Sequence, residues 1–526
     1  MKLRLRAMAA AAAATALLAA LGACSSSPSD SAGSGTASGS AALIQSLVVG
    51  ETGTVTTLDA AKYGPSSVYG AMECLLTMNP AGKVEPWLAQ SVSTPDPTTY
   101  VFHLRKGVKF WDGNEMTSAD VVNALRYYSK PSSILSVWYP GVTSITADDR
   151  YTVTVRLAHP DAAFEAGMTY VSPIFEQKFQ QAHPSNMGQP GVLVMGTGPF
   201  EIDSFDPTRN VQMSANPHWW GGPVNVKHVT ITYFSTETSE ALAMRAGEID
   251  LAFPQSGTSF AASSGAKVVS APSNALAYWS MNPNVPPWNN IHVRRAVAYA
   301  LDRSSILKVI GNVAVPVSTF IPPSELNLLA PAAQVDALLK TVPTYPYDLA
   351  KAKAELAKSP YPHGFSTSTT TLEFGFYTPV CELLAGELAK IGINVSLKEL
   401  TFSQWINYYD GPKTYGNLFV NDNEIFADPS AHASAMITSK GFNTSGWTTP
   451  ALNTLVSEGL ATSDNSKRLA VYGNIMRTIA NEVNYVPLFV VDYNVALRPG
   501  FAITNKFSIV YNFSQPFELY VTRSTT

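Results

Sequence analysis

The chain has 526 residues, more than one hydrophobic core organises, so at least two compact lobes are expected. Charged residues make up only 14% of it, with 35 basic against 39 acidic side chains, and this near balance excludes the basic stripe that nucleic-acid binding requires. Three cysteines are too few for a scaffold held together by disulfides.

The first 23 residues have the pattern of a secretory signal peptide. Three basic residues stand among the first six, and residues 7–20 are uncharged but too short and too rich in alanine for a membrane-spanning helix. The leader ends in Leu-Gly-Ala-Cys, which resembles the bacterial lipobox. Cleavage would then leave Cys24 as an N-terminus carrying several acyl chains, which anchor a protein stably.

Residues 24–40 are almost all small or polar and predict a flexible tether, since such a segment cannot bury a core. We therefore expect an extracytoplasmic protein that is lipid-anchored to the outer face of the cytoplasmic membrane. The alternative is a plain secreted protein in which Cys24 stands by chance.

In the first half of the folded part, short strands alternate with turns. Residues 47–49 predict a strand, and residues 100–105 and 151–157 alternate apolar and polar side chains, as strands with one buried face do. Residues 117–120 resemble a capping box that opens a helix over residues 121–128.

The second half is richer in helices. Apolar residues recur at helical spacing over residues 291–310, which predicts one buried helix face. Further helices are predicted over residues 348–358, 380–391, 454–461 and 467–481, and strands over residues 393–397 and 486–491. Helices and strands mix without a regular βαβ rhythm, so we predict a mixed α/β (α+β) fold with mixed sheets.

Two cysteines remain after the one at the end of the leader. Cys74 and Cys381 lie far apart in the sequence. The sequence leaves open whether they form a single disulfide or stay as two buried thiols.

A series of motifs carries a family resemblance. Residues 100–110 read aromatic-x-Phe-x-Leu-Arg-x-Gly-Val-x-Phe, and Asp-Gly and Ala-Asp-Val follow. In this order the chain is similar to the extracellular solute-binding proteins of ABC importers, in the peptide/nickel-binding family that includes dipeptide and oligopeptide receptors. The other matching segments are residues 84–89, 196–200, 216–222, 246–250, 282–287, 293–303, 391–395 and 428–429.

The resemblance implies a periplasmic-binding-protein-like clamp of two lobes joined by two crossover segments. Lobe I would comprise residues 41–280 and 493–526, with an extra subdomain inserted near residues 80–185, and lobe II would comprise residues 281–492. The expected partners are a small solute, most simply a peptide, and ABC permease and ATPase subunits in other chains. The receptor itself would be a monomer.

A peptide receptor must place an opposite charge beside each ligand terminus, because an unpaired buried charge is costly. In peptide-binding relatives a carboxylate just before the Asp-Pro pair holds the ligand's amine. Here Ile425 stands at the position where that carboxylate is expected, so Asp422 and Glu424, on either side of Asn423, are the candidates. The alternative is a solvated loop of turn-forming residues.

The resemblance also places several uncharged candidates at the cleft. Aromatic side chains there would stack on a sugar or on a peptide side chain, although packing in a lobe core is an equal alternative for each. A glycine allows a backbone to approach a ligand closely. These candidates are Tyr278, Trp279 and Asn282 near the first crossover, Trp405, Asn443 and Trp447 in lobe II, and Thr197 with Gly198 in lobe I.

Catalytic chemistry has weak support. No zinc-helix, nucleophile-elbow or P-loop motif occurs. Ser305 and Lys308 match Ser-x-x-Lys, and Ser-Asp-Asn follows at residues 463–465, but no Lys-Thr-Gly completes an acyl-serine hydrolase. We therefore expect no enzyme, no cofactor and no direct metal ligation. Oligosaccharides and metal or haem complexes remain rival solutes.

Overall fold

The structure, a computed structural model, describes residues 43–524 apart from 65–69, 80, 140, 312–313, 374, 402–403, 406–407, 409–411, 423–426, 439–442 and 505–519. Residues 41–526 form one compact unit. The predicted signal peptide and tether, with Cys24, lie outside the described residues.

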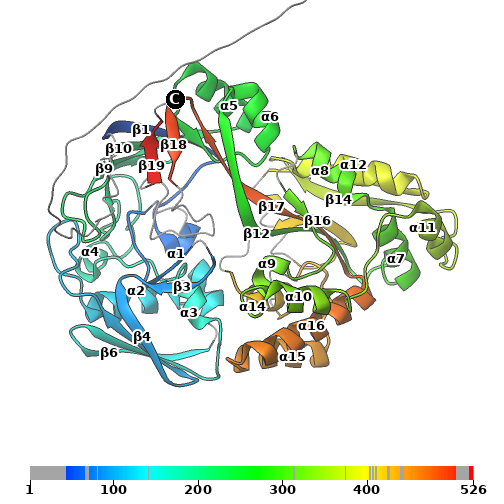
Figure 1. The fold of residues 1–526 in the computed structure, drawn as a ribbon, viewed down its shortest axis with the longest axis horizontal. Coiled ribbons are helices and arrows are strands. Elements are labelled where there is room, and N and C mark those ends of the chain that lie inside the picture. The colour runs from blue at the N-terminus through cyan, green and yellow to red at the C-terminus, as the bar shows by residue number, and fades with distance from the viewer. Residues whose placement is uncertain are drawn as a thin grey trace, which may run out of the picture. The chain divides into compact units, whose positions relative to one another are not determined.

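A nine-stranded sheet runs through this unit in the order β16-β12-β17-β11-β1-β10-β9-β8, with β13 beside β17. Figure 1 shows β12 (Lys267–Met281) and β17 (Tyr485–Leu497) crossing the middle of the unit as its two longest strands. They pair antiparallel from Lys267↔Leu497 to Ser280↔Tyr485. The chain passes from one lobe to the other along β12 and returns along β17. Among the described strands of this sheet, these two connect the lobes.

Lobe I is built on the parallel pair β1 (Ile44–Thr52) and β10 (Val226–Phe234). The antiparallel strands β9 (Asn210–Ala215) and β8 (Phe200–Asp206) extend the sheet beyond β10. The other described elements are β11 (Leu251–Ala252), α1 (Ala60–Tyr63), α5 (Glu237–Ala246), α6 (Gly257–Ser264), β18 (Phe501–Ile503) and β19 (Val521–Arg523).

A separate four-stranded sheet, β4-β5-β7-β6, lies in the region where the inserted subdomain is expected. Tyr100, Phe102 and Leu104 of β5 are buried, as the predicted alternation requires. Thr117 and Asp120 form the predicted capping box of α2 (Ser118–Tyr128). The remaining elements are β2 (Leu76–Met78), β3 (Val84–Pro86), β4 (Ala89–Asp96), β5 (Thr99–Leu104), the 3₁₀ turn η2 (Ile134–Trp138), β6 (Val142–Asp149), β7 (Thr152–Leu157), α3 (Phe164–Gly167) and α4 (Gln177–Ala182).

Lobe II surrounds its end of the crossing strands with helices. Its second sheet is the parallel pair β14 (Phe365–Leu372) and β15 (Ile393–Leu400), joined by α12 (Tyr377–Ala389). The other elements are β13 (Ala314–Pro316), β16 (Asn417–Asp422), α7 (Ile291–Ala300), α8 (Arg303–Val309), α9 (Pro323–Leu326), α10 (Ala332–Leu339), α11 (Leu349–Leu356), α14 (Pro429–Ala433), a π-helical turn (Ser434–Thr438), α15 (Pro450–Ala461) and α16 (Asn465–Glu482).

The apolar stretch at residues 291–310 forms two helices instead of the single predicted one. Leu301 is extended, with ψ at 115°, and ends α7. Asp302 then accepts a hydrogen bond from the backbone N–H of Ser304 and caps α8. The N-cap aspartate therefore starts a new helix here, even though the apolar repeat continues.

The described apolar residues gather mainly into two cores. One draws on residues 44–251 together with Val495, Leu497, Phe501 and Val521. The other draws on residues 275–491.

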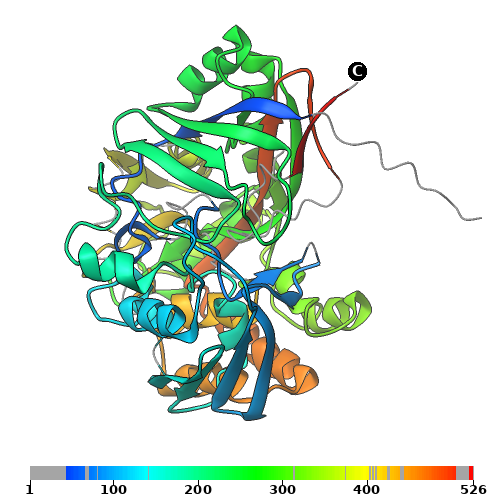
Figure 2. The same cartoon turned by 90° about the vertical axis from the view of Figure 1, so that its left-hand side faces the viewer.

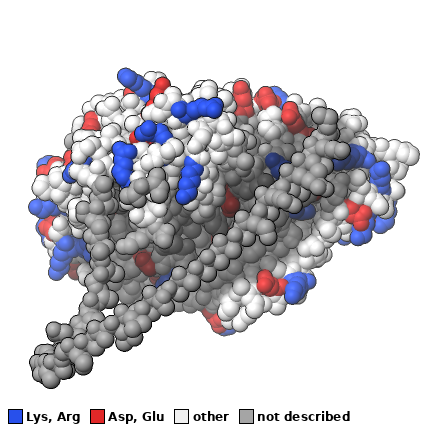
Figure 3. Space-filling view, turned by 45° about the horizontal axis from the view of Figure 1, so that its top comes forward, with Lys and Arg blue, Asp and Glu red and all other residues white. Residues whose placement is uncertain are grey.

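Figure 2 shows the four-stranded sheet at the same end as α15 and α16, in agreement with Figure 1. On the face drawn in Figure 3, acidic and basic side chains of the described residues are interspersed.

Candidate ligand site

The two lobes meet where the crossing strands are irregular. The register of β12 against β17 shifts between Ala271 and Ala275. At this place the Ser273 hydroxyl donates to the carbonyl of Val491 at 2.5 Å and accepts from the N–H of Ala275 at 3.0 Å. A side chain that replaces regular ladder bonds lets two strands change direction without unpaired backbone groups.

A cavity of about 380 Å³ opens between the lobes. Hydroxyl and carboxylate side chains line most of it, and no basic side chain is among the described lining residues. Its volume lies in the range of small-ligand pockets. The lobe I wall is Thr52, Ser235, Thr236, Glu237, Thr238, Ala241, Ser256, Phe260 and Ser263, and the lobe II wall is Glu373, Gly375, Thr378 and Glu399.

A hydrogen bond links α12, on the lobe II wall of this cavity, to strand β16. Tyr377, next to the lining Thr378, donates its hydroxyl to the carbonyl of Asn421 at 3.0 Å. Asn421 precedes Asp422, whose backbone ends β16 opposite Leu276. The side chain of Asp422 and the whole of Asn423 and Glu424 lie outside the described residues. Helix α12, which carries the lining Thr378, is thus bonded to β16 one residue before Asp422.

Tyr278, Trp279 and Trp405 are all buried in the core of lobe II. Tyr278 packs edge-on against Tyr485, with ring centroids 5.3 Å apart. Trp405 packs edge-on against Tyr377 at 5.8 Å. Among described atoms, the indole Nε1 of Trp279 is buried without a hydrogen-bond partner. Tyr278 and Trp405 thus pack on other aromatic side chains of lobe II.

Asn282, Asn443 and Trp447 form a second predicted group, and the first two are buried structural amides. The Asn282 side chain donates to the carbonyl of Lys413 at 2.9 Å. The Asn443 side chain donates to the carbonyl of Trp447 at 3.0 Å and accepts from the Tyr485 hydroxyl at 2.9 Å. These bonds fix the loop that carries the half-buried Trp447.

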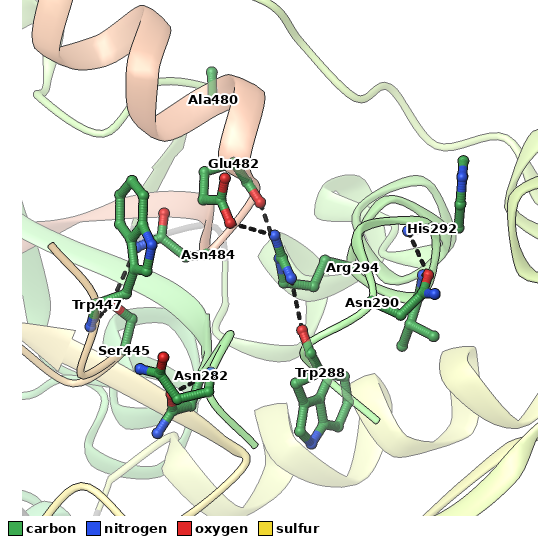
Figure 4. A network of polar contacts seen from close by, with 12 residues as sticks. Asn282, Trp288, Asn290, His292, Arg294, Ser445, Trp447, Ala480, Glu482 and Asn484 are labelled. Carbon is green, nitrogen blue, oxygen red and sulfur yellow. Dashed lines mark hydrogen bonds and ion pairs between the residues drawn. The ribbon is translucent and has the colours of Figure 1, made fainter. Parts of the chain in front are cut away.

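Figure 4 also shows how α7 is anchored beside this loop. Arg294 is buried, and its guanidinium donates to the carbonyl of Trp288 at 2.7 Å and to both the carbonyl and the carboxylate of Glu482. Burial lowers the pKa of Arg294, and the Glu482 carboxylate opposes the shift. Arg294 is therefore an ion-pairing residue of lobe II.

Thr197 and Gly198 lie against a buried carboxylate that the sequence did not single out. The Thr197 hydroxyl donates to Glu73 Oε2 at 2.8 Å. Three indole N–H groups complete the shell of Glu73, from Trp87 at 2.8 Å, Trp219 at 3.1 Å and Trp220 at 3.0 Å. Burial raises the pKa of Glu73 to about 7, and the four donors oppose that rise.

Gly198 is required by the close approach of two chain segments. A Cβ atom there would lie 1.9 Å from the carbonyl oxygen of Gly70, and one at Gly196 would lie 1.9 Å from that of Ala71. Only a residue without a side chain fits at such a distance. The contacts of Thr197 and Gly198 thus bind this loop to the segment that carries Glu73.

Sequence reasoning missed a buried polar cluster just after the candidate carboxylates. Asp428, which was noted only as part of a motif, caps α14 and pairs with Arg468 at 2.6 Å. Glu325 and His432 are buried and lie 3.0 Å apart. Burial and the nearby Asp428 raise the pKa of Glu325 well above its usual value. The partners lie 40 to 107 residues apart in the chain, so no local pattern reveals them.

The residues that suggested a hydrolase have structural roles. The Ser305 hydroxyl donates to Asp302 at 2.7 Å in the first turn of α8, and Lys308 is exposed. Asp464 caps α16 by accepting from the N–H groups of Ser466 and Lys467. Within the described ranges, no three His, Cys, Asp or Glu side chains are grouped to hold a metal ion.

Cys74 and Cys381 are both buried free thiols, which settles the alternative left open by the sequence. Burial raises the pKa of the Cys381 thiol to about 12, so it stays protonated at neutral pH.

None of the described helices is long and apolar enough to cross a membrane.

Three comparisons place the chain among known proteins. The model of the bacterial extracellular solute-binding proteins, family 5, matches residues 83–444. The glutathione-binding protein GsiB of Escherichia coli (strain K12) is 25% identical over 431 residues, which cover 78% of this chain and 81% of GsiB.

Solved structures show the same two-lobed fold. The periplasmic binding protein DppA of Helicobacter pylori, in complex with the peptide STSA, superposes with a TM-score of 0.77 at 23% identity, covering 92% of this chain and 98% of DppA. NikZ of Campylobacter jejuni, in complex with Ni(L-His), gives 0.76 at 16% identity, covering 91% and 99%.

Proposed function

The chain belongs to family 5 of the bacterial extracellular solute-binding proteins, which serve ABC importers as receptors, and on that premise we propose that its solute is a short peptide with a free amine. Its homologues are binding proteins, not enzymes. The chain would capture the peptide between its lobes and deliver it to permease and ATPase subunits in other chains.

The curated relative supports the choice of a peptide. GsiB is named for glutathione, a tripeptide with a free amine. The alignment with this chain covers 81% of GsiB. The interlobe cavity is the single structural observation that carries the proposal. Its hydroxyl and carboxylate lining, drawn from both lobes, suits a solute rich in hydrogen-bonding groups and positive at one end.

The proposed amine site is Asp422, at the end of β16, or Glu424, two residues further along the chain. Asn423, Trp405, Tyr278, Trp279, Asn282, Thr197, Gly198, Asn443 and Trp447 remain proposed site residues. A buried amine needs a carboxylate partner, because desolvation of an unpaired charge costs several kcal/mol.

Isothermal titration calorimetry with glutathione and with N-acetylglutathione tests the amine site. Acetylation removes the positive charge, so we expect glutathione to bind and its acetylated form to bind far more weakly. Asp422→Asn or Glu424→Gln should weaken glutathione binding by about 2–5 kcal/mol, the cost of truncating one partner of a buried charge pair.

Asp336→Asn is the matched control for this experiment, because Asp336 is exposed on α10, outside the interlobe cavity. It should bind glutathione with unchanged affinity. Unchanged affinity in both carboxylate variants would refute the amine site. Binding of an oligosaccharide or of a nickel complex, with no peptide bound, would refute the peptide.

The lipid anchor belongs to the same proposal. We propose that Cys24 is acylated after removal of residues 1–23 and that residues 24–40 tether a monomeric receptor to the membrane. Cys24→Ser should then release the receptor from washed membranes into the medium. Retention of that variant on the membrane, or the absence of incorporated labelled palmitate in the unaltered chain, would contradict an anchor at Cys24.

A further inference from the structure

The inserted subdomain touches lobe II at a contact distant in sequence from the crossing strands. The N–H of Ala162, just before α3, donates to the carbonyl of Leu460 in the last turn of α15 at 2.8 Å. Last-turn carbonyls have no partner within their own helix. The subdomain therefore satisfies a lobe II group that would otherwise face water.

Apolar packing surrounds this hydrogen bond. Met78, Ala163 and Ala166 of the subdomain side form one small buried cluster with Ala431 of α14, and Leu460 packs against it. Small side chains allow the two backbones to approach closely. Figures 1 and 2 both show the subdomain beside α15.

A charged group borders the contact on each side. Asp161 of the subdomain accepts from the N–H of Ala163 at 2.9 Å, and its carbonyl accepts from the Tyr100 hydroxyl at 2.6 Å. Across the contact, Asp428 is paired with Arg468, which also donates to the carbonyl of Gly459 at 3.1 Å. Arg468 thus binds the residue next to Leu460.

We propose that residues 161–166 are a latch that holds the clamp closed on α14 and α15, and that protonation of Asp161 strengthens this latch. The latch is independent of which solute lies in the cleft, because none of its contacts involves the interlobe cavity.

The charges around Asp161 explain the effect of protonation. Burial raises the pKa of Asp161 to about 6, and the Asp428 carboxylate adds to the rise, while the N–H of Ala163, Arg468 and His159 oppose it. Glu165, on the subdomain side, shares the neighbourhood of Tyr100 with Asp161. Glu325 and Tyr472 face Asp428 from lobe II. Arg468 is already bound to Asp428, so it does not fully neutralise a second carboxylate.

The sign of the pH dependence follows from this environment. In an open clamp Asp161 faces water, where an aspartate titrates near pH 4. A group whose pKa is raised on closure favours the closed form below pH 4, and this contribution is lost as the pH rises through about 6. Between pH 5 and pH 7 the ratio of closed to open clamp should fall roughly tenfold.

Distance measurements between spin labels test the latch without added solute. The full chain would carry Cys24→Ser and labels at Ser93→Cys on β4 and Ser457→Cys on α15, both exposed positions. Cys74 and Cys381 are buried and stay unlabelled. We expect the short-distance population to fall roughly tenfold relative to the long one between pH 5 and pH 7. In Asp161→Asn it should be high and independent of pH.

Two further variants decide the outcome. Asp336→Asn, at an exposed position on α10, should keep the pH response of the unaltered chain. Ala162→Pro removes the N–H group that donates to the carbonyl of Leu460. This variant should therefore have a smaller short-distance population at both pH values. An unchanged population in Ala162→Pro would overturn the latch. A pH response that survives in Asp161→Asn, or its absence in the unaltered chain, would overturn the role of Asp161. Since no solute is added, these results do not depend on the peptide assignment.

Discussion

Glu73 shows how much a single buried carboxylate organises. Its two oxygens accept four hydrogen bonds, from three tryptophans and Thr197, which come from three separate segments of lobe I. Arg105 stacks over the Trp220 ring at 4.3 Å and closes the cluster. Each donor would be buried without a partner if the carboxylate were lost, so Glu73 links these segments through polar contacts inside an apolar core.

Glu73→Gln should therefore destabilise the fold. The new amide has the same shape, but its NH₂ group must face the donors on one side. Thr197 is able to accept from it, whereas at least one indole N–H loses its acceptor. We expect a loss of about 2 kcal/mol in the free energy of unfolding, measured by urea denaturation. The exposed Glu85→Gln, whose carboxylate accepts a hydrogen bond from Asn79, is the control, and equal stability of the two variants would contradict this role.

At the scale of elements, the loop at residues 196–198 depends on glycine for packing. It lies so close to residues 70 and 71 that any side chain at Gly196 or Gly198 meets a carbonyl oxygen. This contact holds the loop that precedes β8 against the segment that leads to Glu73. The family motif at this place thus has a steric cause.

Gly198→Ala should lower the free energy of unfolding by about 2–3 kcal/mol, because backbone must move to admit the Cβ atom. Gly386→Ala is the matched comparison. Gly386 is exposed within α12, and a Cβ there meets nothing within 4 Å. That variant should gain about 0.5–1 kcal/mol, since alanine favours helix. Equal shifts in melting temperature for the two variants would contradict the steric account.

The elements themselves were largely predictable from local pattern. The alternation at residues 100–105, the capping box at Thr117 and the helix before Gly392 all appear in the structure. Prediction failed where a local signal competed with periodicity, as at Asp302, which splits one expected helix into two. It also could not assign Tyr278 and Trp279, because an aromatic residue on a crossing strand has the same pattern whether it faces a core or a cleft.

Pairings between distant residues were beyond reach of the sequence. The parallel pair β1 and β10 joins Ile44 to Val226, and Asp428 meets Arg468 across two helices. No periodicity encodes such contacts, because they arise only when the lobes have packed. For the candidate site, the sequence therefore proposes the segment at Asp422, whereas the cavity depends on contacts between distant segments and has no local pattern.

At the scale of the whole molecule, the two crossing strands and the latch predict a clamp with two states. A solute closes the clamp only if it binds the closed form better than the open one. Small-angle X-ray scattering should then show a smaller radius of gyration with saturating glutathione, and no change with N-acetylglutathione. An identical radius of gyration in all three samples would argue against closure driven by a peptide amine.

The peptide assignment is tested most directly by native mass spectrometry of the receptor purified from its own host. We predict a bound species that fragments as a short peptide with a free amino terminus and that is lost from the Asp422→Asn, Glu424→Gln double variant. A bound species that fragments as an oligosaccharide, or that carries the isotope pattern of a metal, would contradict the assignment.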